Sequence, residues 1–159
     1  MSEEHVFIRM QDGVRLAATL FLPDVEGKVP ALLEARPYRK DDCSPGHAVY
    51  RRLRDEGGFA VVRLDVRGTG SSEGIAEDEY SFQERRDLVA VLDWIAKQSW
   101  CTGSIGMWGS SYSGFNSLQI AAERPRPLKG ICALFAADDR YTDDVHYQGG
   151  IRHALDFVD

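Results

Sequence analysis

Six residues, Gly109 to Gly114, constrain the fold of this chain most, because they lie where an apolar strand pattern passes directly into a helix pattern. Upstream, residues 104–108 form a short apolar run between two glycines, which is typical of a buried strand. Downstream, apolar residues at three- and four-residue spacings over 115–122 predict a helix that ends near Pro125. The sequence therefore predicts a strand, a sharp turn and a helix in immediate succession.

Ser111 lies at this turn and is a candidate nucleophile. A serine on so sharp a strand-to-helix turn has its hydroxyl pushed out of the sheet, and small neighbours let the backbone pass close by without clashes. The backbone N–H of Tyr112 then faces a reacting carbonyl, as an oxyanion donor would. The alternative is an ordinary turn, since short glycine and serine clusters are common.

The rest of the chain alternates between strand and helix patterns. Residues 6–10 and 14–22 alternate in polarity around a Gln-Asp-Gly turn and predict an antiparallel hairpin. Apolar runs without polar alternation at 30–35 and 59–66 favour buried strands, and residues 128–137 predict another strand. A capping box at Ser81 begins a long helix with an apolar stripe that includes Phe82 and Leu88. We therefore expect an α/β fold, with a mostly parallel sheet, an antiparallel N-terminal hairpin and helices on both faces.

Composition limits the class of protein. The 159 residues suit one domain with an ordinary hydrophobic content of 43%, and a formal charge of −6 without a basic patch excludes a nucleic-acid surface. The acidic N-terminus lacks a signal-peptide pattern, and no apolar run approaches the roughly 20 residues of a membrane span, so that a cytoplasmic location is expected.

The three cysteines are interpreted as free thiols, because their number is odd and their spacing fits neither a disulfide framework nor a zinc site. Cys132 lies in an apolar run and is expected to be buried, whereas Cys43 and Cys101 fall in expected loops. A cysteine nucleophile is disfavoured because nothing near these residues resembles an activating base.

A serine nucleophile also needs a base, an acid and oxyanion donors. Tyr38 follows a predicted strand in Arg36-Pro37-Tyr38-Arg39-Lys40. Its phenol can donate to the same substrate carbonyl oxygen as the Tyr112 N–H. The alternative is that Tyr38 packs at the sheet edge with its hydroxyl in water. The loop from Asp65 to Gly74 follows another strand and should border the site. It lacks the spacing of a phosphate-binding loop, and we expect Asp65 and Arg67 to hold it by charge-assisted hydrogen bonds.

The base and the acid are harder to place. Hydrolases with this turn supply the acid and then the histidine after the serine, so that His5 and His47 come too early. His146 and His153 come later, but no strand pattern precedes either of them. Acidic residues after the last strand, Asp138 and Asp139 among them, are either a catalytic acid or solvated loop carboxylates, and they lack the spacing of a calcium loop.

Together these motifs resemble the cocaine esterase-like (CocE/NonD) hydrolases, which are grouped with Xaa-Pro dipeptidyl-peptidases and α-amino-acid ester hydrolases. Nearly the whole chain is covered. Four stretches carry the resemblance, namely residues 36–40, 65–74, 100–115 and 139–145, and the third matches every fixed position of the family's Gly-x-Ser-Tyr-x-Gly turn. The resemblance implies an α/β-hydrolase fold and hydrolysis of esters, amides or short peptides without a cofactor or metal. It implies Ser111 as the nucleophile, with the Tyr38 hydroxyl and the Tyr112 N–H as oxyanion donors.

Family members are several times longer, with a helical cap inserted after the part of the sheet that this chain covers. We therefore expect residues 1–150 to be the N-terminal part of the hydrolase core, and 151–159 to begin a truncated cap with a helix near Ile151. On this interpretation the triad acid and base lie outside the chain. The alternative is a non-catalytic α/β module, or a binding protein that keeps the turn for structural reasons. The substrate and the oligomeric state stay open.

Overall fold

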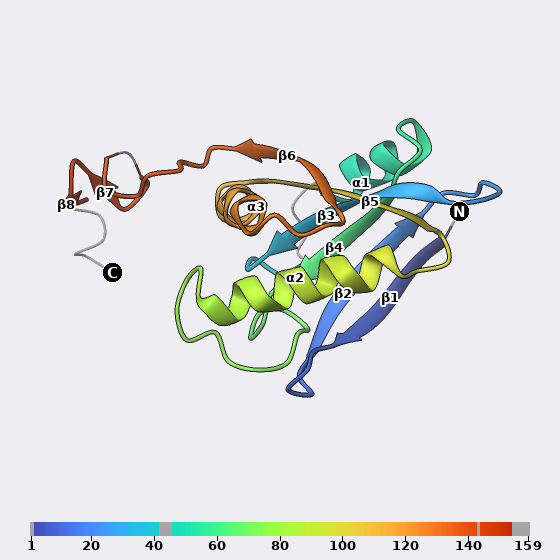
Figure 1. The fold of residues 1–159 in the computed structure, drawn as a ribbon, viewed down its shortest axis with the longest axis horizontal. Coiled ribbons are helices and arrows are strands. Elements are labelled where there is room, and N and C mark those ends of the chain that lie inside the picture. Colours follow the sequence, from blue (N-terminus) through green and yellow to red (C-terminus); the bar gives the residue numbers. More distant parts are fainter. Residues whose placement is uncertain (1, 42–45, 143, 154–159) are drawn as a thin grey trace.

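The computed structural model describes residues 2–41, 46–142 and 144–153 of the chain, and its main feature is one mixed sheet (Figure 1). Six strands form this sheet in the order β1-β2-β4-β3-β5-β6, and two short strands pair separately. The bounds are β1 Ser2–Arg9, β2 Arg15–Leu22, β3 Val29–Arg36, α1 Gly46–Asp55, β4 Ala60–Asp65, α2 Phe82–Ala96, β5 Cys101–Ser110, α3 Tyr112–Glu123, β6 Leu128–Leu134, β7 Tyr147–Gln148 and β8 Ile151–Arg152.

Strand directions follow the sequence patterns. β1 and β2 form the predicted antiparallel hairpin, and β2 also runs antiparallel to β4. The strands β4, β3, β5 and β6 are mutually parallel, so that their carboxyl ends meet at one edge of the sheet. The predicted α/β fold with a mostly parallel sheet is confirmed, and that edge is where the loops of open α/β sheets meet ligands.

Helices cover both faces of the sheet, as expected. On one face, α1 packs through Tyr50 against Phe21 and Val61. On the other face, α2 and α3 pack on the larger core, which includes the buried side chains of Leu33 and Val62. Among the helices of the described ranges, none has the length and apolar character needed to cross a membrane.

The helix α1 was not predicted from the sequence. Tyr50 adds polar contacts between α1 and the sheet: its hydroxyl donates to Glu34 and accepts from Arg36 Nη1 at 3.2 Å, while the Arg63 guanidinium lies 4.8 Å from the Tyr50 ring centre. Burial raises the pKa of Tyr50 to about 12 and also raises the pKa of Glu34. The sequence hardly shows this helix, because the residues of α1 that pack on the sheet, Tyr50 and Leu53, stand among three arginines.

The long helix α2 begins at the predicted cap, where the Ser81 hydroxyl accepts from the Glu84 backbone N–H at 3.2 Å. Its buried face differs from the predicted stripe. Phe82 is 75% exposed, whereas Glu84 and Asp87 are buried together with Leu88 and its apolar neighbours. The two carboxylates are buried because hydrogen-bond donors from neighbouring segments face them, which apolar periodicity does not reveal.

Four expectations near the later strands are wrong. Cys132 is exposed because it lies on the edge strand β6, and Cys101 is buried because it begins β5, while Cys43 lies outside the described residues. The strand predicted to end at residue 137 ends at Leu134. The helix expected near Ile151 is replaced at 151–152 by β8, which pairs with β7 beyond the end of β6 (Figure 1), and residues 154–159 lie outside the described part.

We expect the core under α2 to dominate stability. Replacing the fully buried Leu92 by alanine should lower the free energy of unfolding by about 2–5 kcal/mol, because it removes buried methyl groups and leaves a cavity. Leu134→Ala on the edge strand, where the side chain is 45% exposed, is the matched control and should cost less than about 1 kcal/mol. Urea denaturation of both variants measures the difference, and equal costs would contradict this account of the core.

Candidate active site

Ser111 connects β5 to α3 in a strained backbone conformation, with φ 57° and ψ −123°. A non-glycine residue in this region costs about 1–3 kcal/mol and is kept only where its surroundings hold it. Here the Ser111 N–H donates to Leu134 O at 2.9 Å, and the Ser111 carbonyl accepts from Phe115 N at 3.0 Å. The Ser111 hydroxyl makes no capping bond to the helix, and the residue is partly exposed.

Two glycines allow this sharp turn by close approach. A Cβ on Gly109 would lie 2.1 Å from the Ser113 Cβ, and a Cβ on Gly114 would lie 2.9 Å from Leu134 O and 3.0 Å from the Ala136 Cβ. Because such separations are too short for a real side chain, larger residues at either position would push α3 away from β5 or β6. The predicted strand–turn–helix arrangement is therefore confirmed by the packing.

The first turn of α3 is held by polar side chains that are buried. The Ser113 hydroxyl donates to Ala35 O at the end of β3, at 2.7 Å. The Tyr112 hydroxyl and Asn116 Nδ2 both donate to the Glu84 carboxylate on α2, at 2.8 and 2.9 Å. The start of α3 is thus fixed to both the sheet and the neighbouring helix.

Tyr38 lies just beyond the end of β3, beside the start of α3. Its ring is edge-on to the Tyr112 ring with 6.4 Å between centres, and the residue is 48% exposed. Tyr38 and Tyr112 also line a cavity of about 680 Å³, together with residues of the loop that follows β4, among them Arg67 and Thr69. The structure therefore brings together two of the three predicted site residues at the edge of this cavity, and Ser111 directly precedes one of them.

Asp65, at the carboxyl end of β4, connects two loops of this edge. Its Oδ1 accepts from Lys40 N in the loop that carries Tyr38, and its Oδ2 accepts from Ser71 N at 2.8 Å. The carboxylate is fully buried. The expectation that Asp65 holds its own loop is confirmed, and the same side chain also holds the Tyr38 loop.

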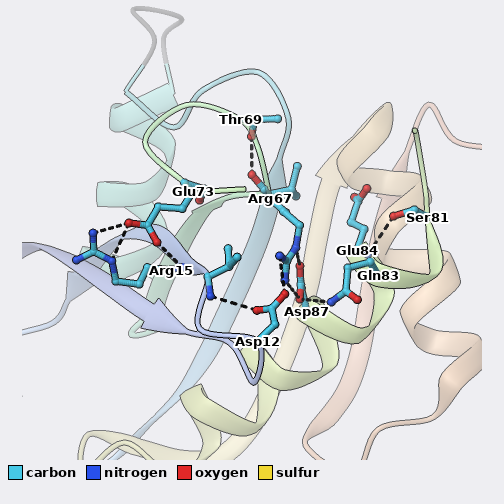
Figure 2. Close-up of polar contacts among 12 residues, drawn as sticks. Asp12, Arg15, Arg67, Thr69, Glu73, Ser81, Gln83, Glu84 and Asp87 are labelled. Carbon is cyan, nitrogen blue, oxygen red and sulfur yellow. Dashed lines mark hydrogen bonds and ion pairs between the residues drawn. The ribbon is translucent and has the colours of Figure 1, made fainter. Parts of the chain in front are cut away.

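Arg67 is clamped by two carboxylates from different parts of the chain (Figure 2). Its Nε and Nη2 donate to the two oxygens of Asp87 on α2 at 2.6 and 2.8 Å, and its Nη1 lies 2.8 Å from Asp12 Oδ2 in the β1–β2 turn. The hydrogen bond to Asp87 is the largest cause that raises the pKa of Arg67. Paired in this way, Arg67 fixes the loop against α2, as the sequence predicted.

Within the described ranges, the contacts of the histidines are made with groups other than Ser111. His5 Nδ1 lies 3.1 Å from Thr19 Oγ1, the His47 ring is edge-on to Phe21, and His146 Nε2 lies 3.7 Å from Glu79 Oε2. The His153 backbone N–H donates to His146 O at 2.8 Å. None of these contacts, in the three ranges that the structure describes, places an imidazole beside the serine. The base of a triad is therefore not identified among them.

The acidic residues after β6 are used in local contacts. Asp139 accepts from Tyr141 N and from the Thr142 hydroxyl, each at 2.9 Å, and these bonds lower its pKa. Asp144 accepts from Arg140 Nε at 3.1 Å. Over the described residues, no group of histidine, cysteine or acidic side chains has the arrangement of a metal site.

Comparison with known proteins identifies the family. The sequence model of the X-Pro dipeptidyl-peptidase (S15 family) matches residues 12–158, and the chain belongs to this family. The chain is 38% identical over 150 residues to a cocaine esterase of Rhodococcus sp. (strain MB1 Bresler), covering 92% of this chain and 25% of that protein. The chain thus spans about a quarter of the length of this relative.

Solved structures agree with this assignment. A CocE/NonD family hydrolase from Staphylococcus aureus superposes with a TM-score of 0.80 at 29% identity, covering 96% of this chain and 30% of that one. An α-amino acid ester hydrolase gives a TM-score of 0.74 at 28% identity, covering 98% of this chain and 28% of that one. These comparisons establish the α/β-hydrolase fold for this chain. They also show that its family consists of hydrolases, which include esterases and peptidases.

Sequence reasoning missed the buried polar residues behind the turn. Glu84 belongs to the capping box that begins at Ser81, and Ser113 is one of the small residues of the turn, and neither pattern predicts a bond between the two helices. No sequence pattern indicates a role for Asn116. The buried face of α3 includes Ser113, Asn116, Ser117 and Ile120, and not the whole predicted apolar stripe, of which Leu118 and Ala121 are only partly buried and Ala122 is exposed.

Replacing Asp65 by alanine should lower the free energy of unfolding by at least about 2 kcal/mol, because it leaves the Lys40 and Ser71 N–H groups without their buried acceptor. Urea denaturation measures this cost, and faster amide hydrogen exchange at both positions should accompany it. The exposed Asp78 of the same region is the control, and Asp78→Ala should change stability by less than about 0.5 kcal/mol. An Asp65→Ala chain with unchanged exchange at Lys40 would contradict the proposed connection between the loops.

The Glu84 carboxyl should make stability depend on pH. Burial raises its pKa above the ordinary value of 4.5, although hydrogen bonds from Tyr112 and Asn116 oppose the shift. Between pH 4.5 and the higher pKa of the folded state, the folded chain binds more protons at Glu84 than the unfolded chain does. The free energy of unfolding therefore falls as the pH rises through this window. Urea denaturation between about pH 4 and 7 should show Glu84→Gln gaining stability relative to the unmodified chain as the pH rises. A difference that is independent of pH would contradict the shift.

Proposed function

We propose that this chain is the N-terminal part of a serine hydrolase that cleaves ester or amide bonds through an acyl-enzyme on Ser111. The observation that carries the proposal is the strained backbone of Ser111, whose own N–H and carbonyl are bonded to β6 and α3. Strain of this kind is tolerated where the surrounding structure holds it, and it is typical of a nucleophile presented between a strand and a helix.

The donors for the oxyanion are the Tyr112 N–H and the Tyr38 hydroxyl. Tyr112 is the first residue of α3, where backbone N–H groups have no partner within the helix. The helix dipole adds partial positive charge at the same point. The Tyr38 ring lies against the Tyr112 ring and is half exposed, so that its hydroxyl is available to a substrate in the adjoining cavity.

In the proposed reaction the Ser111 oxygen attacks the carbonyl carbon of the substrate. The serine proton passes to a base, and the negative charge that develops on the carbonyl oxygen is stabilised by the two donors. The base and the acid that orients it are assigned to residues outside this chain. This assignment is supported by the histidine contacts described above and by the small share of its relatives that the chain covers.

A fluorophosphonate probe tests the nucleophile. The product of the complete reading frame should be labelled at Ser111 and should hydrolyse p-nitrophenyl acetate. The 159-residue chain should react with both the probe and the ester at least about a thousandfold more slowly, because it lacks the base and acid of a triad.

Mass spectrometry of the labelled peptide locates the adduct, and Ser111→Ala should abolish it. Ser110→Ala, one residue before the turn, is the matched control and should still be labelled. Labelling that persists in Ser111→Ala would remove the assignment, and equal reactivity of the short chain would contradict the missing base.

A further inference from the structure

The carboxylate of Glu84 bridges α2 to the first turn of α3. Glu84 is 6% exposed, and its two oxygens accept from different residues of α3: Oε2 from the Tyr112 hydroxyl at 2.8 Å and Oε1 from Asn116 Nδ2 at 2.9 Å. Tyr112 and Asn116 are four residues apart and therefore lie on the same face of the helix. One buried carboxylate thus fixes the residue that directly follows Ser111.

The Tyr112 hydroxyl is held from a second direction. It accepts from the backbone N–H of Tyr80 at 3.1 Å, and the Tyr80 ring stacks on the Tyr112 ring with 4.2 Å between centres. Tyr80 itself has a φ of 54°, a left-handed conformation that a tyrosine rarely adopts. The side chain of Tyr112 is therefore held by a carboxylate, a backbone amide and an aromatic ring, and it also makes a T-shaped contact with the ring of Tyr38.

Stability alone does not explain a carboxylate at this place. Burial raises the pKa of Glu84, which shows that the charged form is disfavoured there. Apolar side chains of similar volume would hold two helices together without this desolvation cost. What the carboxylate adds is direction, since hydrogen bonds restrict where the Tyr112 hydroxyl lies much more narrowly than apolar contact does.

We propose that Glu84 is a positioning residue for the oxyanion donors of the Ser111 reaction, acting through the hydroxyl of Tyr112. The inference rests on the proposed function of Ser111. Fixing the Tyr112 ring fixes its Cα, and with it the peptide N–H that is the first donor. The same ring forms the wall against which Tyr38, the second donor, packs. Glu84 touches neither substrate nor the reacting atoms.

The test uses the product of the complete reading frame with p-nitrophenyl acetate as substrate. Glu84→Ala and Tyr112→Phe should each lower kcat by about 10- to 100-fold, because small displacements of a donor reduce the rate steeply. KM should change by less than about twofold, since the ground state is bound as before. The double variant should be no slower than the slower single one, because both substitutions break the same bond.

Two further variants separate positioning from folding. Glu84→Gln keeps an oxygen acceptor for the Tyr112 hydroxyl and should recover most of kcat. Leu88→Ala, one turn further along α2 in the core, lowers stability but should leave kcat unchanged at temperatures where the protein is folded. If Glu84→Ala keeps kcat within about twofold of the unmodified protein, or if Leu88→Ala lowers it equally, the positioning role is wrong.

The amide resonance of Tyr112 tests the positioning role even if the protein is inactive. In the 159-residue chain with ¹⁵N-labelled tyrosine, the Tyr112 amide resonance should shift or broaden in Glu84→Ala and stay in place in Leu88→Ala. An unshifted Tyr112 resonance in Glu84→Ala would overturn the inference without reference to activity. If Ser111→Ala retains full activity, the proposed function is wrong. If the activity depends on Ser111 but does not change in the Glu84 variants, only the positioning role of Glu84 is wrong.

Discussion

The strained backbone of Ser111 is the constraint on which the rest of the structure depends. Its N–H is bonded to β6 and its carbonyl to the first turn of α3, so that the turn is fixed only when the strand, the helix and the neighbouring strand are all in place. The glycines at 109 and 114 allow the close approach that this geometry needs. Local strain is thus maintained by contacts between elements that are distant in the sequence.

The same edge of the sheet is stabilised by buried carboxylates, each of which connects segments from different parts of the chain. Asp65 joins the loop of Tyr38 to the loop after β4, Asp87 holds Arg67 against α2, and Glu84 joins α2 to α3. Each carboxylate is satisfied by two or more donors, which offsets the cost of removing it from water. Such connections limit the movement of the loops, and a site that must hold donors in fixed positions benefits from that rigidity.

Much of the fold could be predicted from the sequence, because buried parallel strands and the strand–turn–helix motif leave clear apolar patterns. The hairpin, the four parallel strands and both helices behind the site follow from such patterns. The helix α1 could not be predicted, since Tyr50 and Leu53, which pack on the sheet, stand among arginines and leave only a weak apolar pattern. Cys132 was expected to be buried because the sequence does not show that β6 is an edge strand.

The candidate site was predictable only in part. Ser111 and Tyr112 follow from a local motif, whereas Tyr38 and Glu84 come from distant segments and meet Tyr112 only through the topology of the sheet. Among the described residues, the histidine contacts lie away from the serine, and the base therefore remains part of the proposal.

A crystal structure of the phosphonylated protein tests the central claim most directly. The account predicts a phosphonate bonded to the Ser111 oxygen, with one phosphoryl oxygen about 3 Å from both the Tyr112 nitrogen and the Tyr38 hydroxyl. A phosphonyl group on another residue, or a phosphoryl oxygen that faces away from these two donors, would contradict it.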